Sequence, residues 1–213
     1  MSRRFSGIIA VVCVGAGLLV ACSGGTVGGT PAPATGSTPT SSAAAASSAG
    51  TSDVPKVATP LPASVLDGSP CDGALTTEQV AHFIGTAKTP ERTDITAGPA
   101  CSWLSSDGVS GGITVYYQTK TQVGLAYDYR TNKPAASRWE PTELQGYPAV
   151  ALVLKGNDQS VSGTCTFSVG IRDDLAFSAG VTLGDSARKR GVDSCAAAKD
   201  IANTVLTNLK GRS

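Results

Sequence analysis

The stretch Thr164-Cys165-Thr166-Phe167-Ser168-Val169-Gly170-Ile171 alternates apolar and small polar side chains over its whole length. In an extended chain, Cys165, Phe167, Val169 and Ile171 share one face, and the four residues between them share the other. A period of two is typical of an antiparallel strand that buries one face and leaves the other more polar. The stretch therefore predicts a half-buried antiparallel strand.

Other strand-like segments lie on both sides of this stretch. They are residues 101–104, 113–119, 139–144, 149–154 and 175–181. The first two flank a loop rich in Gly, Ser and Asp and predict a hairpin, while Gly146 and Arg172-Asp173-Asp174 mark later turns. Residues 121–131 fit either a short helix that ends before Pro134 or a further strand.

A helix is predicted at each end of the strand-rich region. Thr76 and Gln79 form a capping-box pattern at the start of residues 76–84, which carry one apolar face. Apolar residues recur at helical spacing over residues 193–210, with Asp193 or Ser194 as the N-cap. The predicted fold class is α+β, an antiparallel sheet with N- and C-terminal helices packed on it.

The N-terminus has the pattern of a secreted, lipidated precursor. Arg3 and Arg4 precede an apolar run over residues 5–21, which ends in the lipobox Leu19-Val20-Ala21-Cys22. A transmembrane helix is the alternative, but a run of about 17 residues rich in Gly and Ala is at the lower limit for spanning a bilayer. We predict a signal peptide over residues 1–21, export by the ordinary secretory route and lipidation of Cys22.

Residues 22–69 are predicted to be the lipidated cysteine and a disordered linker. The tract is dominated by Ser, Thr, Gly, Ala and Pro and contains only three charges, at Asp53, Lys56 and Asp67. Such a composition buries too little apolar surface to offset the entropy of ordering. A linker of this kind spans on the order of 35–40 Å, and its Ser and Thr residues permit O-glycosylation or a bare tether. The globular domain is then expected over residues 70–213.

Six cysteines are present, of which Cys13 leaves with the signal peptide and Cys22 is the lipidation site. The remainder, Cys71, Cys101, Cys165 and Cys195, are even in number, which in an exported chain predicts two disulfides. Three connectivities are possible. We favour Cys71–Cys101 and Cys165–Cys195, because each pins a terminal helix to a strand, and each is worth roughly 3.5–4 kcal/mol in the chain-entropy model.

The charge balance and the cysteine spacing exclude several classes of function. The precursor has 17 Lys+Arg against 16 Asp+Glu, and loss of Arg3 and Arg4 leaves 15 basic residues, so the mature chain is near neutral. A nucleic-acid-binding protein needs a basic surplus, so we predict no nucleic acid as partner. No C-x-x-C occurs, so neither a metal nor a redox pair is expected, and we predict no cofactor.

Candidate catalytic residues are sparse. His82 is the single histidine and has no acidic residue beside it, and the chain lacks a G-x-S-x-G motif. Asp173-Asp174 fits a turn, and Glu140 and Glu143 bracket Pro141 without suggesting glycosidase chemistry. We therefore predict that the protein is not an enzyme.

Two sequence features have both a structural and a functional interpretation. Arg188-Lys189-Arg190 fits a solvated loop or a contact with anionic envelope lipid or polymer. The larger aromatic side chains fit core packing or the lining of a ligand groove. They are Trp103, Tyr116, Tyr117, Tyr127, Tyr129, Trp139 and Tyr147.

An ordered set of short motifs resembles an actinobacterial, mycobacterial-type cell-envelope lipoprotein family with a secreted domain of unknown function and four cysteines. The motifs are Pro70-Cys71, Cys101-Ser102-Trp103, Gly146-Tyr147-Pro148-Ala149, Cys165-Thr166-Phe167-Ser168-Val169 and Asp193-Ser194-Cys195-Ala196-Ala197-Ala198. The resemblance covers residues 70–213. It implies export, lipid anchoring and paired cysteines, and it supplies no catalytic residues.

These observations lead to one functional expectation and one alternative. We expect a lipoprotein on the extracytoplasmic face of the cell membrane, acting as a non-enzymatic binding or accessory module for an envelope component or a membrane protein. The alternative is a carrier of a lipid or apolar small molecule in a groove of the domain. The lipid on Cys22 would provide the membrane contact in either case.

Overall fold

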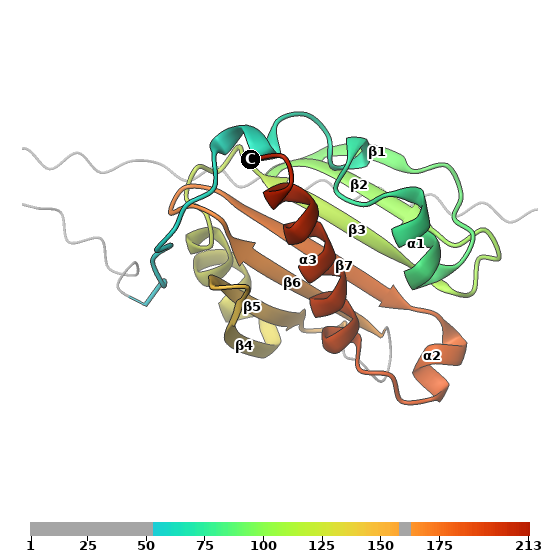
Figure 1. The fold of residues 1–213 in the computed structure, drawn as a ribbon. Helices are drawn as coiled ribbons and strands as arrows, with labels where there is room; N and C mark the ends of the chain where they lie inside the picture. Colours follow the sequence, from blue (N-terminus) through green and yellow to red (C-terminus); the bar gives the residue numbers. More distant parts are fainter. Residues whose placement is uncertain (1–52, 158–162) are drawn as a thin grey trace, which may run out of the picture. The chain divides into compact units, whose positions relative to one another are not determined.

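The computed structural model describes residues 53–157 and 163–213 (Figure 1). Within these residues, seven strands form one antiparallel sheet in the order β1-β2-β3-β7-β6-β5-β4. The strands are β1 (Glu91–Ile95), β2 (Gly98–Leu104), β3 (Gly111–Gln118), β4 (Ala136–Leu144), β5 (Tyr147–Leu154), β6 (Thr164–Gly170) and β7 (Ala176–Leu183). The predicted antiparallel α+β fold is confirmed, although β1 was not predicted.

The sheet consists of two runs of sequential strands that meet at its centre. Strands β1, β2 and β3 are neighbours in chain order, as are β4 to β7, and the seam between the two runs is the antiparallel pair β3–β7. The connection across residues 119–135 ends in the π-helix η3 (Asp128–Asn132) and the 3-10 helix η4 (Lys133–Ala135). The short helix considered for residues 121–131 forms in its second half, where residues 126–127 are α-helical and lead into η3, whereas the alternative strand does not form.

One face of the sheet is covered by helices and forms the main core. Figure 1 shows α3 (Ser194–Lys210) lying across β6 and β7, while α1 (Thr77–Ile84) contacts β3. Phe167, Val169 and Phe177 of the strands pack with Ile201 and Val205 of α3 in this core. Burying each large apolar side chain contributes about 1.5–3 kcal/mol. The apolar face of β6 and the apolar face of α3 pack against each other and form one interface.

Both predicted terminal helices begin where their capping residues indicate. The Thr76 hydroxyl accepts the Gln79 N–H and the Gln79 side chain accepts the Thr76 N–H, which completes the capping box of α1. Asp193 caps α3 by accepting the N–H groups of Cys195 and Ala196. The short helix α2 (Asp185–Lys189) occupies part of the segment that the sequence suggested was a loop.

The chain enters the domain earlier than predicted. Val65 and Leu66, in the 3-10 helix η1 (Ala63–Leu66), are buried in the main core, and the Leu61 N–H donates to the Ile171 carbonyl. The Lys56 ammonium pairs with Asp173 at 3.2 Å. The predicted linker boundary at residue 69 is therefore wrong, because its few apolar residues find partners on the sheet, and the packed chain includes residues 53–69.

Both predicted disulfides are present, with the favoured connectivity. Cys71, in the 3-10 helix η2 (Pro70–Asp72), bonds to Cys101 of β2 with a Cα–Cα distance of 5.1 Å. Cys165 of β6 bonds to Cys195 at the start of α3 with a Cα–Cα distance of 5.0 Å. Each disulfide therefore ties a terminal helical segment to the covered face of the sheet.

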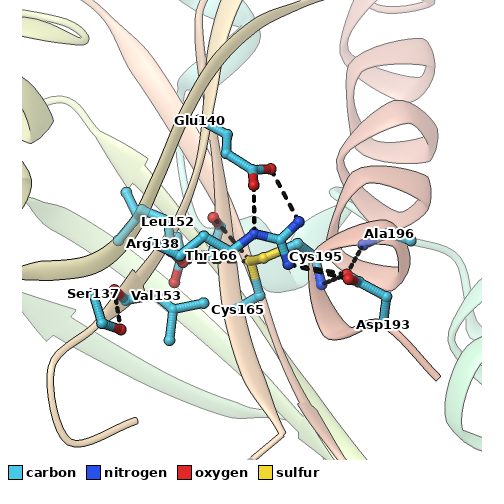
Figure 2. Close-up of polar contacts among 10 residues, drawn as sticks. All are labelled: Ser137, Arg138, Glu140, Leu152, Val153, Cys165, Thr166, Asp193, Cys195 and Ala196. Carbon is cyan, nitrogen blue, oxygen red and sulfur yellow. Dashed lines mark hydrogen bonds and ion pairs between the residues drawn. A yellow bond between two sulfur atoms is a disulfide. The ribbon is translucent and has the colours of Figure 1, made fainter. Parts of the chain in front are cut away.

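An ionic cluster beside the second disulfide fastens β4 to the N-terminus of α3 (Figure 2). The Arg138 guanidinium donates two hydrogen bonds to the Glu140 carboxylate, at 2.8 and 3.0 Å, and a further bond to Asp193 Oδ2 at 3.1 Å. The Ala196 N–H, then Arg138, hold the pKa of Asp193 below its ordinary value against the opposing effect of burial. The cluster thus links the N-terminal cap of α3 to the edge strand β4.

Two of the sequence predictions fall elsewhere in the chain. Cys22 and the signal peptide over residues 1–21 lie outside the described residues, as does most of the predicted linker. In the part of the chain that the structure describes, no helix combines the length and apolar character needed to cross a membrane.

Candidate functional site

The face of the sheet opposite α3 carries small polar side chains. Because neighbouring strand residues point to opposite faces, Gln118, Ser168 and Ser178 point away from the main core. Part of this face is covered by the connection over residues 119–135, where Leu125 packs against Val150 and Leu152 in a second, smaller apolar cluster. The uncovered part forms a depression beside that connection.

This depression, which we call the polar hollow, has a volume of about 300 Å³ and is open to solvent. Its floor and walls combine acidic, amide, hydroxyl and phenol groups with an apolar rim. The residues that define it are Ile95, Tyr116, Gln118, Tyr127, Asp128, Asn132, Leu152, Leu154, Thr166 and Ser178, together with Thr96 and Ala97. A cavity of this size is at the lower end of the range for small-molecule sites.

A hydrogen-bonded network forms the floor of the polar hollow. Gln118 Nε2 donates to Asp128 Oδ2 at 2.9 Å and to Ser178 Oγ at 2.8 Å. Asn132 Nδ2 donates to Asp128 Oδ1 at 2.6 Å. The Ser168 and Ser178 hydroxyl oxygens lie 2.8 Å apart and share a hydrogen bond. The network joins η3 to β3, β6 and β7.

The π-helix η3 places both Asp128 and Asn132 in this network. Its wider turn brings these two residues, four apart in sequence, close enough for the Asn132 amide to bond the Asp128 carboxyl. π-helical turns are rare and occur frequently at functional sites. The local backbone and the hydrogen-bonded side chains therefore both indicate a candidate functional site at this segment.

Asp128 is an unusual carboxyl group for a surface segment. Its side chain is buried, with 1% of the residue exposed, and no ion pair to it is present among the residues that the structure describes. Burial raises the pKa of Asp128, and the hydrogen bonds from Gln118, Asn132 and Ser168 only partly oppose this effect. A carboxyl perturbed by burial at the floor of a cleft is a candidate functional group.

The same floor contains a buried acceptor without a partner. Gln118 is 3% exposed, and its Oε1 atom has no hydrogen-bond partner, although both hydrogens of its amide are used. Leaving such a group unpaired costs about 1–3 kcal/mol. This buried acceptor, in a residue that lines the hollow, lacks the donor that a bound water or a ligand would supply.

Tyr116 forms a wall of the polar hollow by crossing the neighbouring strand. Its hydroxyl lies over Gly180 of β7, where an added Cβ would be 3.3 Å from the phenol oxygen and 3.7 Å from Thr166 Oγ1. Burial raises the pKa of Tyr116, so the phenol stays neutral at physiological pH. Gly180 thus gives Tyr116 the space to turn toward the hollow.

The candidate catalytic residues from the sequence are not brought together. His82 lies exposed on α1, with its ring 5.3 Å from that of Phe83. Asp173 accepts hydrogen bonds from Lys56 and from the Val57 N–H, and Glu140 pairs with Arg138. In the basic run, Arg188 pairs with Asp185 at the start of α2.

The aromatic residues predicted to share either a core or a groove are divided between the two. Tyr116 and Tyr127 line the polar hollow. Trp103, Tyr117 and Tyr147 are buried in the main core. Tyr129 and Trp139 pack edge to face with ring centroids 5.0 Å apart.

Sequence reasoning missed the floor of the polar hollow altogether. Gln118, Ser168 and Ser178 occupy positions that alternation assigns to a solvent-facing side, where polar residues need no explanation. The one available signal was Asp128 between Tyr127 and Tyr129, a charge inside an aromatic-rich segment. Only the tertiary fold shows that this charge is buried.

A second depression, the apolar groove, lies between α1 and β2. It has a volume of about 570 Å³ and includes Leu75, Val80, Ala81, Pro90 and Trp103 along its walls. Lys88 lies at its edge, and the Cys71–Cys101 disulfide borders it. Thr77, Thr86 and Thr89 add hydroxyl groups to its lining.

The fold and these two depressions define a disulfide-linked α+β domain with ligand-sized sites on opposite faces of its sheet. No group of three or more His, Cys, Asp or Glu residues is placed to hold a metal ion within the described ranges. The chain belongs to the family described as "Protein of unknown function (DUF3558)", whose model matches residues 17–208. Comparison with curated proteins and with solved structures found no significant match.

Proposed function

We propose that the protein is a lipid-anchored binding module of the extracytoplasmic membrane face, which holds a component of the cell envelope in the polar hollow without transforming it. The observation that carries this proposal is the floor of the hollow, where buried Asp128 and the unpartnered Gln118 Oε1 lie together. Buried polar groups that the fold leaves unsatisfied are usually completed by a ligand or by water.

Binding is favoured over catalysis by the way the carboxyl is held. Both Asp128 oxygens accept hydrogen bonds from amide groups, Oδ2 from Gln118 and Oδ1 from Asn132. A general base must reach the proton of a substrate, whereas a carboxyl clamped in this way is suited to orienting a bound group. His82 lies on α1, in the layer over the opposite face of the sheet.

The anchoring part of the proposal is supported by the N-terminal sequence. The lipobox Leu19-Val20-Ala21-Cys22 follows an apolar run and precedes a Ser, Thr, Gly, Ala and Pro tract. Lipid on Cys22 would hold the domain within reach of other envelope components. Such a tether raises the local concentration of the domain near membrane-associated partners.

Ligand binding is tested on the full chain in a nonionic detergent by titrating a set of small fragments of mixed charge. Thr166→Tyr fills the hollow, while Thr182→Tyr adds the same ring at an exposed position on β7 of the same face. We expect fragments to bind the wild type and Thr182→Tyr but not Thr166→Tyr. Fragment binding that Thr166→Tyr leaves unchanged would remove the hollow as the site.

Anchoring is tested by mass spectrometry of the N-terminal peptide from protein purified from membranes. We expect the mature chain to start at a diacylglycerol-modified Cys22 and Cys22→Ala to accumulate as an unprocessed precursor. Recovery of an unmodified mature N-terminus at any other residue would contradict lipid anchoring.

The apolar groove favours a second candidate function, that of a carrier for a lipid or apolar small molecule. Its volume of about 570 Å³ and its aliphatic and indole walls suit an acyl or ring system. Native mass spectrometry of protein from its own cells should then show bound lipid that Ala81→Trp displaces. Protein isolated without lipid, and unable to take it up from micelles, would exclude the carrier function.

A further inference from the structure

The amide hydrogens of Gln118, on the floor of the polar hollow, are already committed. Gln118 donates one to Asp128 and one to Ser178. The Ser168 and Ser178 hydroxyls share a further hydrogen bond, in which either can be the donor. Gln118 therefore has no hydrogen left to donate and one acceptor atom left to use. The unused atom is Gln118 Oε1.

The charge in the lining of the hollow is of one sign only. Asp128 is the acidic residue of the lining, and no lysine, arginine or histidine is among the described residues that line the hollow. A buried carboxylate without a cationic partner is costly, so it is either neutralised by a proton or compensated by a cation. The fold supplies hydrogen bonds to Asp128 but no such cation.

We propose that the polar hollow binds the primary ammonium group of a small organic molecule, which donates an N–H to Gln118 Oε1 and supplies the positive charge opposite Asp128. This inference rests on the proposed function, because it takes the hollow as the ligand site. An ammonium group brings the hydrogen-bond donor that Gln118 Oε1 lacks and the positive charge that Asp128 lacks.

The remaining walls are compatible with such a ligand and unfavourable to others. Tyr116 and Tyr127 provide aromatic rings that attract cations, and Ile95, Leu152 and Leu154 offer apolar contact for a short aliphatic body. An anionic group would face the Asp128 carboxyl and an unpaired acceptor. A neutral hydroxyl could pair with Gln118 but would leave the charge of Asp128 uncompensated.

The proposal predicts how affinity depends on pH. The other titratable side chains in the lining are the phenols of Tyr116 from β3 and Tyr127 from the connection, while β5, β6 and β7 contribute Leu, Thr and Ser. The cation binds the ionised form of Asp128, whose pKa burial has raised. Affinity should be full above that pKa and fall roughly tenfold per pH unit below it, where a proton competes with the ligand.

The experiment compares probes of matched size on the full chain in a nonionic detergent, by calorimetry between pH 5 and pH 8. At pH 8, n-butylammonium should bind at least tenfold more tightly than n-butanol or butyrate. Thr166→Tyr should abolish this binding and Thr182→Tyr should retain it. Asp128→Asn should weaken n-butylammonium at least tenfold while leaving n-butanol unchanged, and the pH profile gives the same information if that variant does not fold.

Two further pairs separate the sources from which a primary ammonium could come. Glucosamine against glucose tests an amino sugar, and glycerophosphoethanolamine against glycerophosphocholine tests a lipid headgroup. Preference for the primary amine in either pair supports the inference and indicates the source.

Two outcomes would overturn the inference, and they are distinguishable. If n-butanol or glucose binds as tightly as its amine and Thr166→Tyr blocks it, the hollow is a binding site but not one for ammonium. If no probe of any charge responds to Thr166→Tyr, both the ammonium inference and the proposed site are wrong.

Discussion

The two faces of the sheet are built from the same strands and differ in almost every other respect. On β7, Phe177, Ala179 and Val181 enter the main core beneath α3, whereas Ser178 and Gly180 belong to the polar hollow or its wall. Both disulfides and the capped helix lie on the covered side. The residues of the main core and those of the proposed binding site therefore alternate along one strand, and we expect substitutions on one face to have little effect on the other.

The largest loss of folding stability should come from a substitution on the covered face. Phe177→Ala removes a side chain with 0% exposure and should lower the free energy of unfolding by about 3–5 kcal/mol. Thr182→Ala, at an exposed position on the other face of the same strand, should change it by no more than about 0.5 kcal/mol. Urea unfolding of the oxidised proteins measures both, and similar losses would contradict the division between faces.

A pH titration sharpens the comparison at the polar hollow. The folded-state pKa of Asp128 is raised, so the folded protein binds this proton more tightly than the unfolded chain does. Its contribution to stability is then fully present below the unfolded pKa and is lost as the pH rises through the folded pKa, by at most about 1.4 kcal/mol per pH unit. Asp128→Asn removes the titration while keeping a side chain of the same shape.

Urea unfolding at pH 5, 6, 7 and 8 should therefore show wild type gaining on Asp128→Asn as the pH falls. Asp193 serves as a control with a constant contribution, because its pKa is lowered from the ordinary value of 3.8 and the group stays ionised throughout this range. A wild-type advantage that grows with rising pH would show that Asp128 is stabilised as a carboxylate.

A smaller effect is expected at the cap of α3. Asp193→Ala loses the bonds to Cys195 N and Ala196 N and should cost about 0.5–2 kcal/mol. Asp193→Asn keeps a good cap and loses only the pairing with Arg138, which is partly exposed and retains Glu140. We expect it to cost less than half as much in thermal or urea unfolding; equal costs would assign the effect to the ion pair.

The smallest effect should be found where the chain enters the domain. The Lys56–Asp173 pair has side chains that are 82% and 53% exposed, so solvent screens it. Lys56→Ala should cost less than about 1 kcal/mol, and the difference should shrink further in high salt. A larger loss that salt leaves unchanged would mean that the lysine stem packs on the domain.

The covered face could be predicted from sequence because periodicity and caps report directly on it. Alternation identified β6, helical spacing identified α3, and Thr76 and Asp193 marked the helix starts. The disulfide pairing followed from the same picture of terminal helices tied to strands. These signals are local in sequence. Apolar side chains mark the buried faces of β6 and α3, and polar caps mark the helix starts.

The polar hollow could not be predicted because its chemistry comes from distant residues. Gln118 and Ser178 are 60 positions apart and meet only because β3 and β7 pair at the seam. Asp128 is buried by a π-helix that no simple period indicates. The early start of the domain was missed for a related reason, since Val65 and Leu66 gain partners only from the folded sheet.

The placement of the disulfides has a consequence for the order in which the domain assembles. Each bond joins residues 30 positions apart and lies within one of the two strand runs, so neither crosses the seam between β3 and β7. Contacts between near neighbours in sequence form faster than distant ones, so each run can close and oxidise by itself. We expect the seam to close last, and an intermediate with both disulfides formed would still lack the polar hollow.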